Sequence, residues 1–234
     1  MAWLALALSA CGDAEPAAPA GTRLEYRFDF DWEAAALVGD TRVVETNLGF
    51  RVGIERLYVA VGALELVPCT EEATLEAAWR FLGPSVAYAD HGWTSDATRL
   101  EPRLVENVFG DVSLLGPVEA SGAAYCEFFW TLTPVEGAAS DGVELERISL
   151  LFEGWVEGPG TAERRALDAE LRVGRGALVP LTDNWAPGRD RVRVTRYPAR
   201  ALDDIAFDTE PTEDALFEFA LQLLRGAEVR FEAG

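Results

Sequence analysis

The stretch AAYCEFFWTLTP, residues 123–134, alternates in side-chain character with a period of two. One set of alternate residues holds Ala124, Cys126, Phe128, Trp130 and Leu132, and the other runs from Tyr125 to Thr133. This period is typical of a β-strand, in which successive side chains point to opposite faces. Because Phe129 adds an aromatic side chain to the second face, we expect a central strand that is covered on both sides.

Strand patterns recur along the chain. Residues 23–32, RLEYRFDFDW, alternate throughout and predict a half-buried strand with its charged face in solvent. The nearly continuous apolar run at 49–68 fits two strands, or one long bent strand with a bulge at Gly62. Further strands, separated by turn residues, are expected within 104–115, 143–156, 165–173, 191–197 and 228–231. The arginine-rich strand at 191–197 is expected at a sheet edge, where charge blocks edge pairing.

Two segments change to a helical period. Residues 70–82 begin at Thr70, a capping residue, and place apolar side chains on one face. Residues 213–225 follow a second capping residue, Thr212, and end before Gly226. Many short strands with two short peripheral helices predict a mainly β fold. We expect an antiparallel β-sandwich that forms a single domain over residues 23–234.

The composition limits the partners of this chain. The chain has 234 residues, 49% of them hydrophobic, and a net charge of −20 from 40 acidic and 20 basic residues, all of them arginine. Such an acidic protein is not expected to bind nucleic acid, because that binding depends on neutralising phosphates. An electrostatic hold on anionic lipid is excluded for the same reason. The charge itself predicts solubility, with cation binding as the alternative, and carries no information about the fold.

The N-terminus resembles a lipoprotein signal. Residues 1–10, MAWLALALSA, are too short to span a bilayer but fit the apolar region of a signal peptide. Leu8, Ser9, Ala10 and Cys11 match the bacterial lipobox, in which Cys11 is lipidated and becomes the first residue. Residues 11–22 are rich in proline and alanine and predict a flexible tether. The alternative is a chance cysteine beside an apolar run. The signal predicts a lipid-anchored protein of the cell envelope, in the periplasm or on the outer-membrane surface.

The other two cysteines form a pair by count. With Cys11 used by lipid, Cys69 and Cys126 remain, each on or next to a predicted strand. Outside the cytoplasm they are expected to form a disulfide between strands. The alternative, a metal or redox site, lacks the close C-x-x-C spacing.

Candidate ligand-binding residues cluster around His91, the sole histidine. His91 lies beside Asp90 and near Asp96, a set that fits a copper or zinc site. The competing interpretation is a loop histidine with only local hydrogen bonds. Trp93 and Trp185 lie in predicted loops and are candidates for an exposed ligand patch. Four other tryptophans lie on apolar faces and are expected in the core, namely Trp32, Trp79, Trp130 and Trp155. The sequence contains no G-x-S-x-G elbow and no glycine-rich phosphate loop.

Three motifs carry a resemblance to known proteins. RLYVAVGALELVPC at 56–69, SVAYADHGWTS at 85–95 and GAAYCEFFWTL at 122–132 resemble uncharacterised secreted lipoproteins of GC-rich deltaproteobacteria such as myxobacteria. The resemblance covers residues 50–135 and implies location and fold. The strand LYVAVGALELV is also similar to one in the methanobactin-operon copper-binding periplasmic proteins, which are sandwiches that act with a haem enzyme. Their four-cysteine pattern is missing here.

Taken together, these patterns favour a lipid-anchored extracytoplasmic binding or structural module without catalytic activity. Its partners are the membrane, through the lipid, and an unidentified protein or small ligand. The first alternative is a periplasmic copper-binding protein that acts with a partner enzyme. The second is a carbohydrate-active enzyme, since an acidic chain offers many carboxylate pairs.

Overall fold

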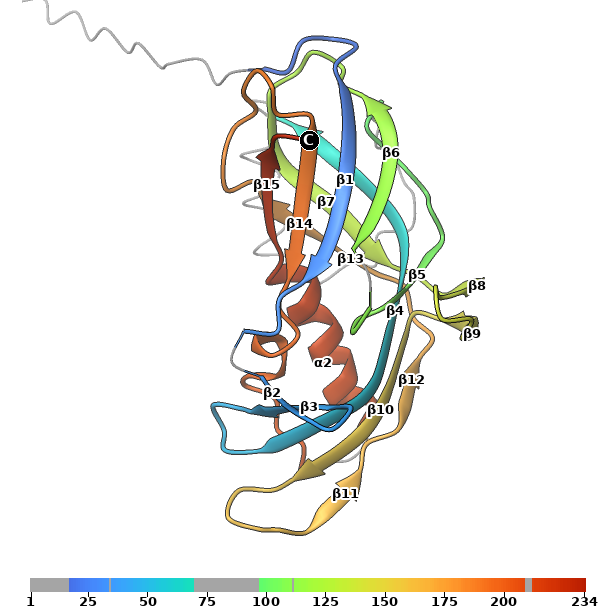
Figure 1. The fold of residues 1–234 in the computed structure, drawn as a ribbon, viewed down its shortest axis with the longest axis vertical. Coiled ribbons are helices and arrows are strands. Elements are labelled where there is room, and N and C mark those ends of the chain that lie inside the picture. Colours follow the sequence, from blue (N-terminus) through green and yellow to red (C-terminus); the bar gives the residue numbers. More distant parts are fainter. Residues whose placement is uncertain (1–16, 34, 70–96, 111, 209–211) are drawn as a thin grey trace, which may run out of the picture.

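A computed structural model describes residues 17–33, 35–69, 97–110, 112–208 and 212–234. Within these ranges the chain is mainly β, as expected, and its strands form a four-stranded sheet, a nine-stranded sheet and a two-stranded ribbon (Figure 1). The helix predicted over 70–82 lies outside the described residues.

The four-stranded sheet has the order β15-β14-β1-β6. Its strands are β1 (Arg23–Phe30), β6 (Ser113–Glu119), β14 (Arg191–Arg196) and β15 (Glu228–Glu232). Neighbouring strands are antiparallel except β1 and β14, which run parallel. The prediction that the arginine-rich strand lies at an edge is wrong, because β14 is hydrogen-bonded on both sides. Its arginines form ion pairs with carboxylates of β1, β5 and β15, and these ion pairs compensate their charge inside the sheet.

The nine-stranded sheet is organised around β4 (Arg51–Pro68), which runs the length of the molecule in Figure 1. The first half of β4 pairs with β3 and β10, and its second half pairs with β5 and β7. The other strands are β2 (Ala36–Val38), β3 (Thr41–Glu45), β5 (Leu104–Asn107), β7 (Tyr125–Leu132), β10 (Leu150–Glu157), β11 (Arg164–Ala166), β12 (Ala169–Leu171) and β13 (Arg175–Pro180).

A single bent strand is therefore the correct alternative for the apolar run at 49–68. Its register with β7 shifts between Val61 and Leu64, at the glycine predicted to form a bulge. A Cβ on Gly62 would lie 2.4 Å from Thr133 Oγ1, so the bend brings the two chains closer than a side chain allows. Glycine permits this approach.

The strand β7 is central, between β4 and β13, as its pattern predicts. Phe128, Trp130 and Leu132 are buried, but Phe129 and Thr131 on the other face are only half-buried. Covering on both sides is thus incomplete. The four-stranded sheet and the helix both lie on the Phe128 side, where Trp130 Nε1 donates a hydrogen bond to Leu224 O at 3.1 Å.

The expected strand at 143–156 is divided into two. A two-stranded ribbon is formed by β8 (Val135–Ala138) and β9 (Glu144–Ile148), and β10 begins after Ser149. Arg147, with φ of 58°, turns the chain near this break. The alternating segment at 165–173 is likewise interrupted between β11 and β12. The first break coincides with a shift in the alternation, from buried Leu145 to buried Ile148 and Leu150. The second break has no such sign, because the apolar alternation continues from Leu167 through Ala169 to Leu171.

One α-helix occurs among the described residues, α2 (Thr212–Arg225), together with a 3-10 turn, η1 (Arg200–Leu202). The helix is at the predicted place, and its apolar face is buried while Glu213, Asp214, Glu218 and Arg225 are exposed. Leu216, Phe219, Leu223 and Leu224 are all at most 1% exposed. In Figure 1 α2 lies below the four-stranded sheet, and Phe219 contacts Phe152 of β10 at a ring distance of 5.9 Å. The helix therefore covers a part of the large sheet that the small sheet does not reach.

The two sheets contact each other through aromatic side chains of β1 and β7. The ring centres of Tyr26 and Phe128 are 5.7 Å apart, and Phe28 lies 6.3 Å from both Phe128 and Trp130. One hydrophobic cluster contains residues of both sheets and of α2. Ala18 belongs to it and is 0% exposed, so the packed body begins nearer the N-terminus than the expected tether boundary at 22.

Candidate functional site

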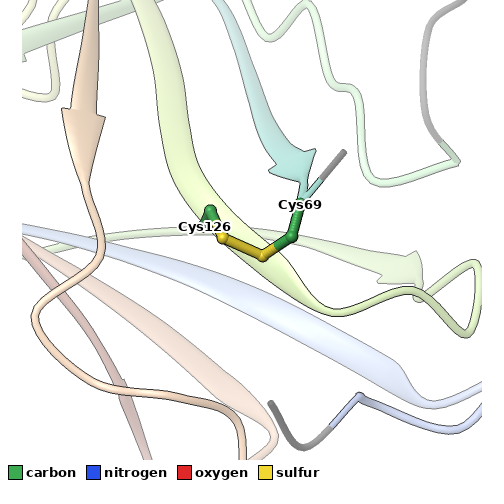
Figure 2. The surroundings of a disulfide bond; sticks show 2 residues. All are labelled: Cys69 and Cys126. Carbon is green, nitrogen blue, oxygen red and sulfur yellow. A yellow bond between two sulfur atoms is a disulfide. The ribbon is translucent and has the colours of Figure 1, made fainter. Parts of the chain in front are cut away.

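The disulfide between Cys69 and Cys126 is present, as predicted from the cysteine count (Figure 2). The two Cα atoms are 5.0 Å apart, and the bridge joins the end of β4 to β7. Cys69 N also donates a hydrogen bond to Ala124 O at 2.8 Å. This bond continues the β4–β7 pairing past Pro68, the last residue of β4. The pair is a structural link between two neighbouring strands, and its thiols are not free to bind metal.

Most of the other predicted site residues lie outside the described residues. These are Cys11, Asp90, His91, Trp93 and Asp96, so lipidation, the copper or zinc site and the tryptophan patch stay predictions. Across the part of the chain that the structure describes, no group of three or more His, Cys, Asp or Glu residues is placed to hold a metal ion. Trp185 is partly buried against the main core, and its Nε1 is buried without an acceptor among the described residues.

A pocket that we call the Trp32 pocket lies where β1 ends, beside β3 and the β5–β6 connection. Its volume is about 200 Å³, and its walls include Asp29, Phe30, Trp32, Arg42, Val108 and Phe109. Charged groups of opposite sign and aromatic rings thus meet in one small space.

Two stacked rings form one wall of the Trp32 pocket. The ring centres of Trp32 and Phe109 are 5.1 Å apart with an angle of 2° between the planes. Trp32 Nε1 donates to Val108 O at 3.3 Å, so the indole is fixed to the β5–β6 connection. Arg42 Cζ lies 5.7 Å from the Trp32 ring centre, a distance at which a guanidinium is attracted to the ring.

Asp29 supplies a carboxylate to the Trp32 pocket. It lies on the side of β1 that the sequence assigns to solvent, yet it is 8% exposed. Arg193 Nη2 lies 2.6 Å from Asp29 Oδ2, and Arg27 Nε lies 3.8 Å from the same oxygen. These arginines explain why the carboxylate tolerates burial. Asp29 Oδ1, in contrast, is buried and accepts no hydrogen bond from any described residue.

Arg42 supplies the opposite charge. It is half-buried on β3, and its Nε is buried without a hydrogen-bond acceptor in the described ranges. The ion pairs seen among those ranges do not include Arg42, although the chain carries a net charge of −20. Arg42 therefore offers a positive charge that no carboxylate of a described residue pairs with.

A buried ion pair contacts Phe30, one of the residues that line the Trp32 pocket. The Arg196 guanidinium lies 3.7 Å from the ring centre of Phe30 and makes a two-bond pair with Glu106. The Nη2–Oε1 distance is 3.0 Å, and Arg196 and Glu106 are 0% and 3% exposed. Because this pair is fully enclosed, it holds β14, β5 and the end of β1 in one geometry.

A second hollow runs along the β8–β9 ribbon. Its volume is about 470 Å³, but all its lining residues come from the ribbon itself, including the carboxylates of Glu136, Glu144 and Glu146. None of the buried polar atoms without a partner in the described chain belongs to this ribbon. The Trp32 pocket is the better candidate site despite its smaller volume, because side chains of three separate segments line it.

The sequence did not indicate the Trp32 pocket. Three of the four tryptophans expected in the core are buried, since Trp32 is 9% exposed, Trp130 0% and Trp155 9%, and Trp79 lies outside the described residues. Arg42 is one of 20 basic residues, and Asp29 is one of 40 acidic residues, so neither stands out. The only available signal was the dense aromatic and charged alternation near the end of β1.

No family model, curated protein or solved structure was found to match this chain. Among the described helices, none is both long and apolar enough to cross a membrane.

Proposed function

We propose that the chain is a lipid-anchored protein of the cell envelope that acts as a binding module without catalytic activity. The observation that carries the location is the Cys69–Cys126 disulfide, because structural disulfides form and persist outside the reducing cytoplasm. The lipobox that ends at Cys11 and the proline- and alanine-rich segment after it agree with this location.

Binding is supported by the composition of the Trp32 pocket. Arg42 Nε and Asp29 Oδ1 are buried polar atoms that the described part of the fold leaves without partners. Five other buried polar atoms share this property, most of them on the four-stranded sheet, so these two atoms alone do not indicate a ligand. The support for binding is the half-buried Arg42 side chain, which lies over the aromatic wall of the pocket and forms no ion pair with a described residue.

We further infer that the body belongs to the β-sandwich class. The ring contacts between β1 and β7 support two sheets that face each other. The parallel β1–β14 pair and the insertion of α2 beside the small sheet would make it an unusual member of that class.

The location is tested in the cells that produce the protein. We expect the full chain to incorporate a clickable palmitate analogue and to fractionate with membranes, and Cys11→Ala to lose both properties. Cys126→Ala serves as the matched control, because it removes a cysteine that is not in the lipobox and should keep the label. A full chain that stays unlabelled and cytoplasmic would overturn the proposal.

A second measurement examines the thiols. Cys69 and Cys126 should resist alkylation in unreduced cell extracts made in the presence of the alkylating agent, and react only after reduction. Free thiols at both positions in freshly made protein would contradict an oxidising location even if the lipid label were found.

A further inference from the structure

The turn between β8 and β9 carries the one Asp-Gly pair of the sequence, Asp141–Gly142, and both residues are exposed. An Asp-Gly pair is chemically labile, because glycine has no side chain to hinder attack of its backbone nitrogen on the preceding carboxyl group. The attack closes a five-membered succinimide ring. When this ring reopens at the other carbonyl, the backbone runs through the former side chain and the residue is isoaspartate.

The Asp141 carboxylate is held by donors from three segments. Its Oδ2 accepts hydrogen bonds from Tyr58 OH of β4 at 2.6 Å and from Asn107 Nδ2 of β5 at 2.7 Å. Its Oδ1 accepts a hydrogen bond from Val143 N at 3.2 Å. Hydrogen bonds to an ionised acceptor are stronger than those between neutral groups. Ring closure removes one carboxylate oxygen and the negative charge, so it proceeds only when these bonds are broken.

Two further features of the turn oppose the reaction. The Gly142 N–H donates a hydrogen bond to Ala139 O at 2.9 Å, so the attacking nitrogen is itself held in the turn. The hydrogen bond from Tyr58 also lowers the pKa of Asp141 and keeps its carboxyl group ionised. Ring closure proceeds from the neutral carboxyl group, because an oxygen leaves readily as water and not as an oxide ion.

We propose that Asp141–Gly142 is a latent site of isoaspartate formation, and that Tyr58 and Asn107 suppress this reaction in the folded protein. The Gly142 nitrogen bonds to Asp141 Cγ, and the carboxyl hydroxyl leaves with the amide proton as water. One water then adds to the imide. Opening at Cγ restores aspartate, and opening at the backbone carbonyl gives isoaspartate, so the composition of the chain is unchanged. The inference is independent of the location and the binding proposed above.

The modification changes how the β8–β9 ribbon is attached. Isoaspartate adds one methylene group to the backbone of the turn and displaces the carboxylate, so the bonds to Tyr58 and Asn107 are lost. The ribbon then keeps its apolar contacts with the large sheet, in a cluster that includes Ala60, Val105 and Leu145. The turn is therefore released while the body of the protein keeps its fold.

The test compares the purified full-length protein with a synthetic peptide of residues 137–144, in which the Asp-Gly pair has no tertiary contacts. Both are incubated in the same buffer at the same temperature. Cleavage after Glu136 and Glu144 releases the same segment from the protein. Liquid chromatography with mass spectrometry then separates its aspartate and isoaspartate forms and gives the rate of conversion.

We expect wild type to form isoaspartate at 141 about tenfold or more slowly than the peptide, because charge-assisted hydrogen bonds must first be broken. Tyr58→Phe and Asn107→Ala should each raise the rate in the folded protein about fivefold or more. Tyr197→Phe is the matched control, because it removes a hydroxyl that donates to a carboxylate outside the ribbon, Glu228 Oε2 at 2.7 Å. Its rate should equal that of wild type.

Two results would overturn the inference. One is a wild-type rate equal to that of the peptide, and the other is a rate in folded Tyr58→Phe and Asn107→Ala that stays at the wild-type value. Circular dichroism and urea unfolding of each variant separate local release of the turn from global unfolding. If one of the two variants fails to fold, the other decides. Equal acceleration by Tyr197→Phe would assign the effect to lowered overall stability and would also contradict the role of Tyr58.

Discussion

Arg196 shows how one residue can connect elements that are far apart in the sequence. Its guanidinium is 0% exposed, lies over the Phe30 ring at 3.7 Å and pairs with Glu106 of β5 through two hydrogen bonds. Removing a charge from water costs free energy, and in this pair the attraction and hydrogen bonds between the two groups offset that cost. Either partner alone would be an uncompensated charge in the core.

Glu106→Gln should therefore destabilise the protein by about 3–5 kcal/mol, because it leaves the Arg196 guanidinium buried without a carboxylate. Urea unfolding at pH 7 measures the change. The double variant Glu106→Leu and Arg196→Met should recover much of the loss, since apolar replacement of a buried pair is often neutral. The exposed pair of Arg56 and Glu153 is the control, and Glu153→Gln should change stability by about 1 kcal/mol or less. An effect of Glu106→Gln as small as that of Glu153→Gln would contradict the argument.

Glu157 supports a second prediction about a single residue, which concerns how folding stability depends on pH. Arg164 Nε lies 2.7 Å from its Oε1 and Arg51 Nη1 lies 2.5 Å from its Oε2. The hydrogen bond from Arg164, with a contribution from Arg51, lowers the pKa of Glu157 below its usual range. A lowered carboxyl pKa means that the folded state binds its proton less tightly than the unfolded state. The resulting stability is present above the unfolded pKa, about 4.3, and is lost as the pH falls through the lowered folded pKa.

Glu157→Gln should consequently be less stable than wild type at pH 7, and the difference should shrink as the pH is lowered below about 4. Urea unfolding of both proteins from pH 7 to pH 3 gives the comparison. Glu119→Gln, at an exposed position on the edge strand β6, should show a small difference that does not follow this course. A gap between Glu157→Gln and wild type that stays constant or widens toward acid would show that the ion pairs with Arg51 and Arg164 are not its source.

At the scale of elements, the pairing of β4 with β10 depends on two glycines. Gly53 of β4 is opposite Trp155, and a Cβ on Gly53 would lie 2.1 Å from Trp155 Cε2. On the partner strand, a Cβ on Gly154 would lie 2.0 Å from Gly53 O. On the Trp155 ring, the Arg164 Cζ atom lies 4.0 Å from the ring centre. The indole therefore lies flat on the β4 backbone, in space that any side chain at 53 would occupy.

Gly53→Ala should lower stability by about 1–3 kcal/mol, the usual range for overpacking a filled space. Thermal and urea unfolding provide the measurement. Gly158→Ala is the matched control, because its Cβ would meet nothing closer than Thr161 Oγ1 at 3.7 Å, and it should stay within about 0.5 kcal/mol of wild type. Equal stability of the two variants would mean that the Trp155 ring moves aside without loss.

Local sequence patterns predicted well where strands and a helix occur. They did not predict which of these elements lie next to one another. The alternation at 23–32 and 123–134, the glycine in the apolar run at 49–68 and the capped period at 213–225 each gave an element that the structure contains. The parallel pairing of β1 with β14 had no such signal, because it depends on residues more than 160 positions apart. The position of α2 had no such signal either, since a helix pattern predicts a buried apolar face but does not say which part of a sheet that face covers.

The Trp32 pocket illustrates the same limit. Asp29, Arg42 and Phe109 come from three separate segments, and each is unremarkable in its own segment. Their chemistry appears only when the end of β1 passes between β3 and the β5–β6 connection. The disulfide was predictable, in contrast, because the assignment of Cys11 to a lipobox left Cys69 and Cys126 as the one remaining pair.

For the whole molecule, the disulfide joins the longest strand to the central strand that pairs with it. Cys69 and Cys126 are 57 positions apart, and both strands contribute to the core between the two sheets. A cross-link over a loop of this length reduces the entropy of the unfolded chain by an amount equivalent to about 4 kcal/mol in the chain-entropy model. That is a large part of the net stability of a typical domain.

Replacing both cysteines, with Cys69→Ser and Cys126→Ser together, should therefore lower the free energy of unfolding by about 4 kcal/mol, with the native β content retained at low temperature. Circular dichroism and urea unfolding without reductant measure both properties. Reductant provides the internal control, since it should shift the urea midpoint of wild type toward that of the double variant and leave the double variant unchanged. The ten residues from Ala60 to Cys69 still pair with β5 and β7 through backbone hydrogen bonds, which is why we expect loss of stability and not loss of fold. If the double variant matches oxidised wild type in urea, the bridge is not a stabilising link, and its presence would have to be explained by the compartment alone.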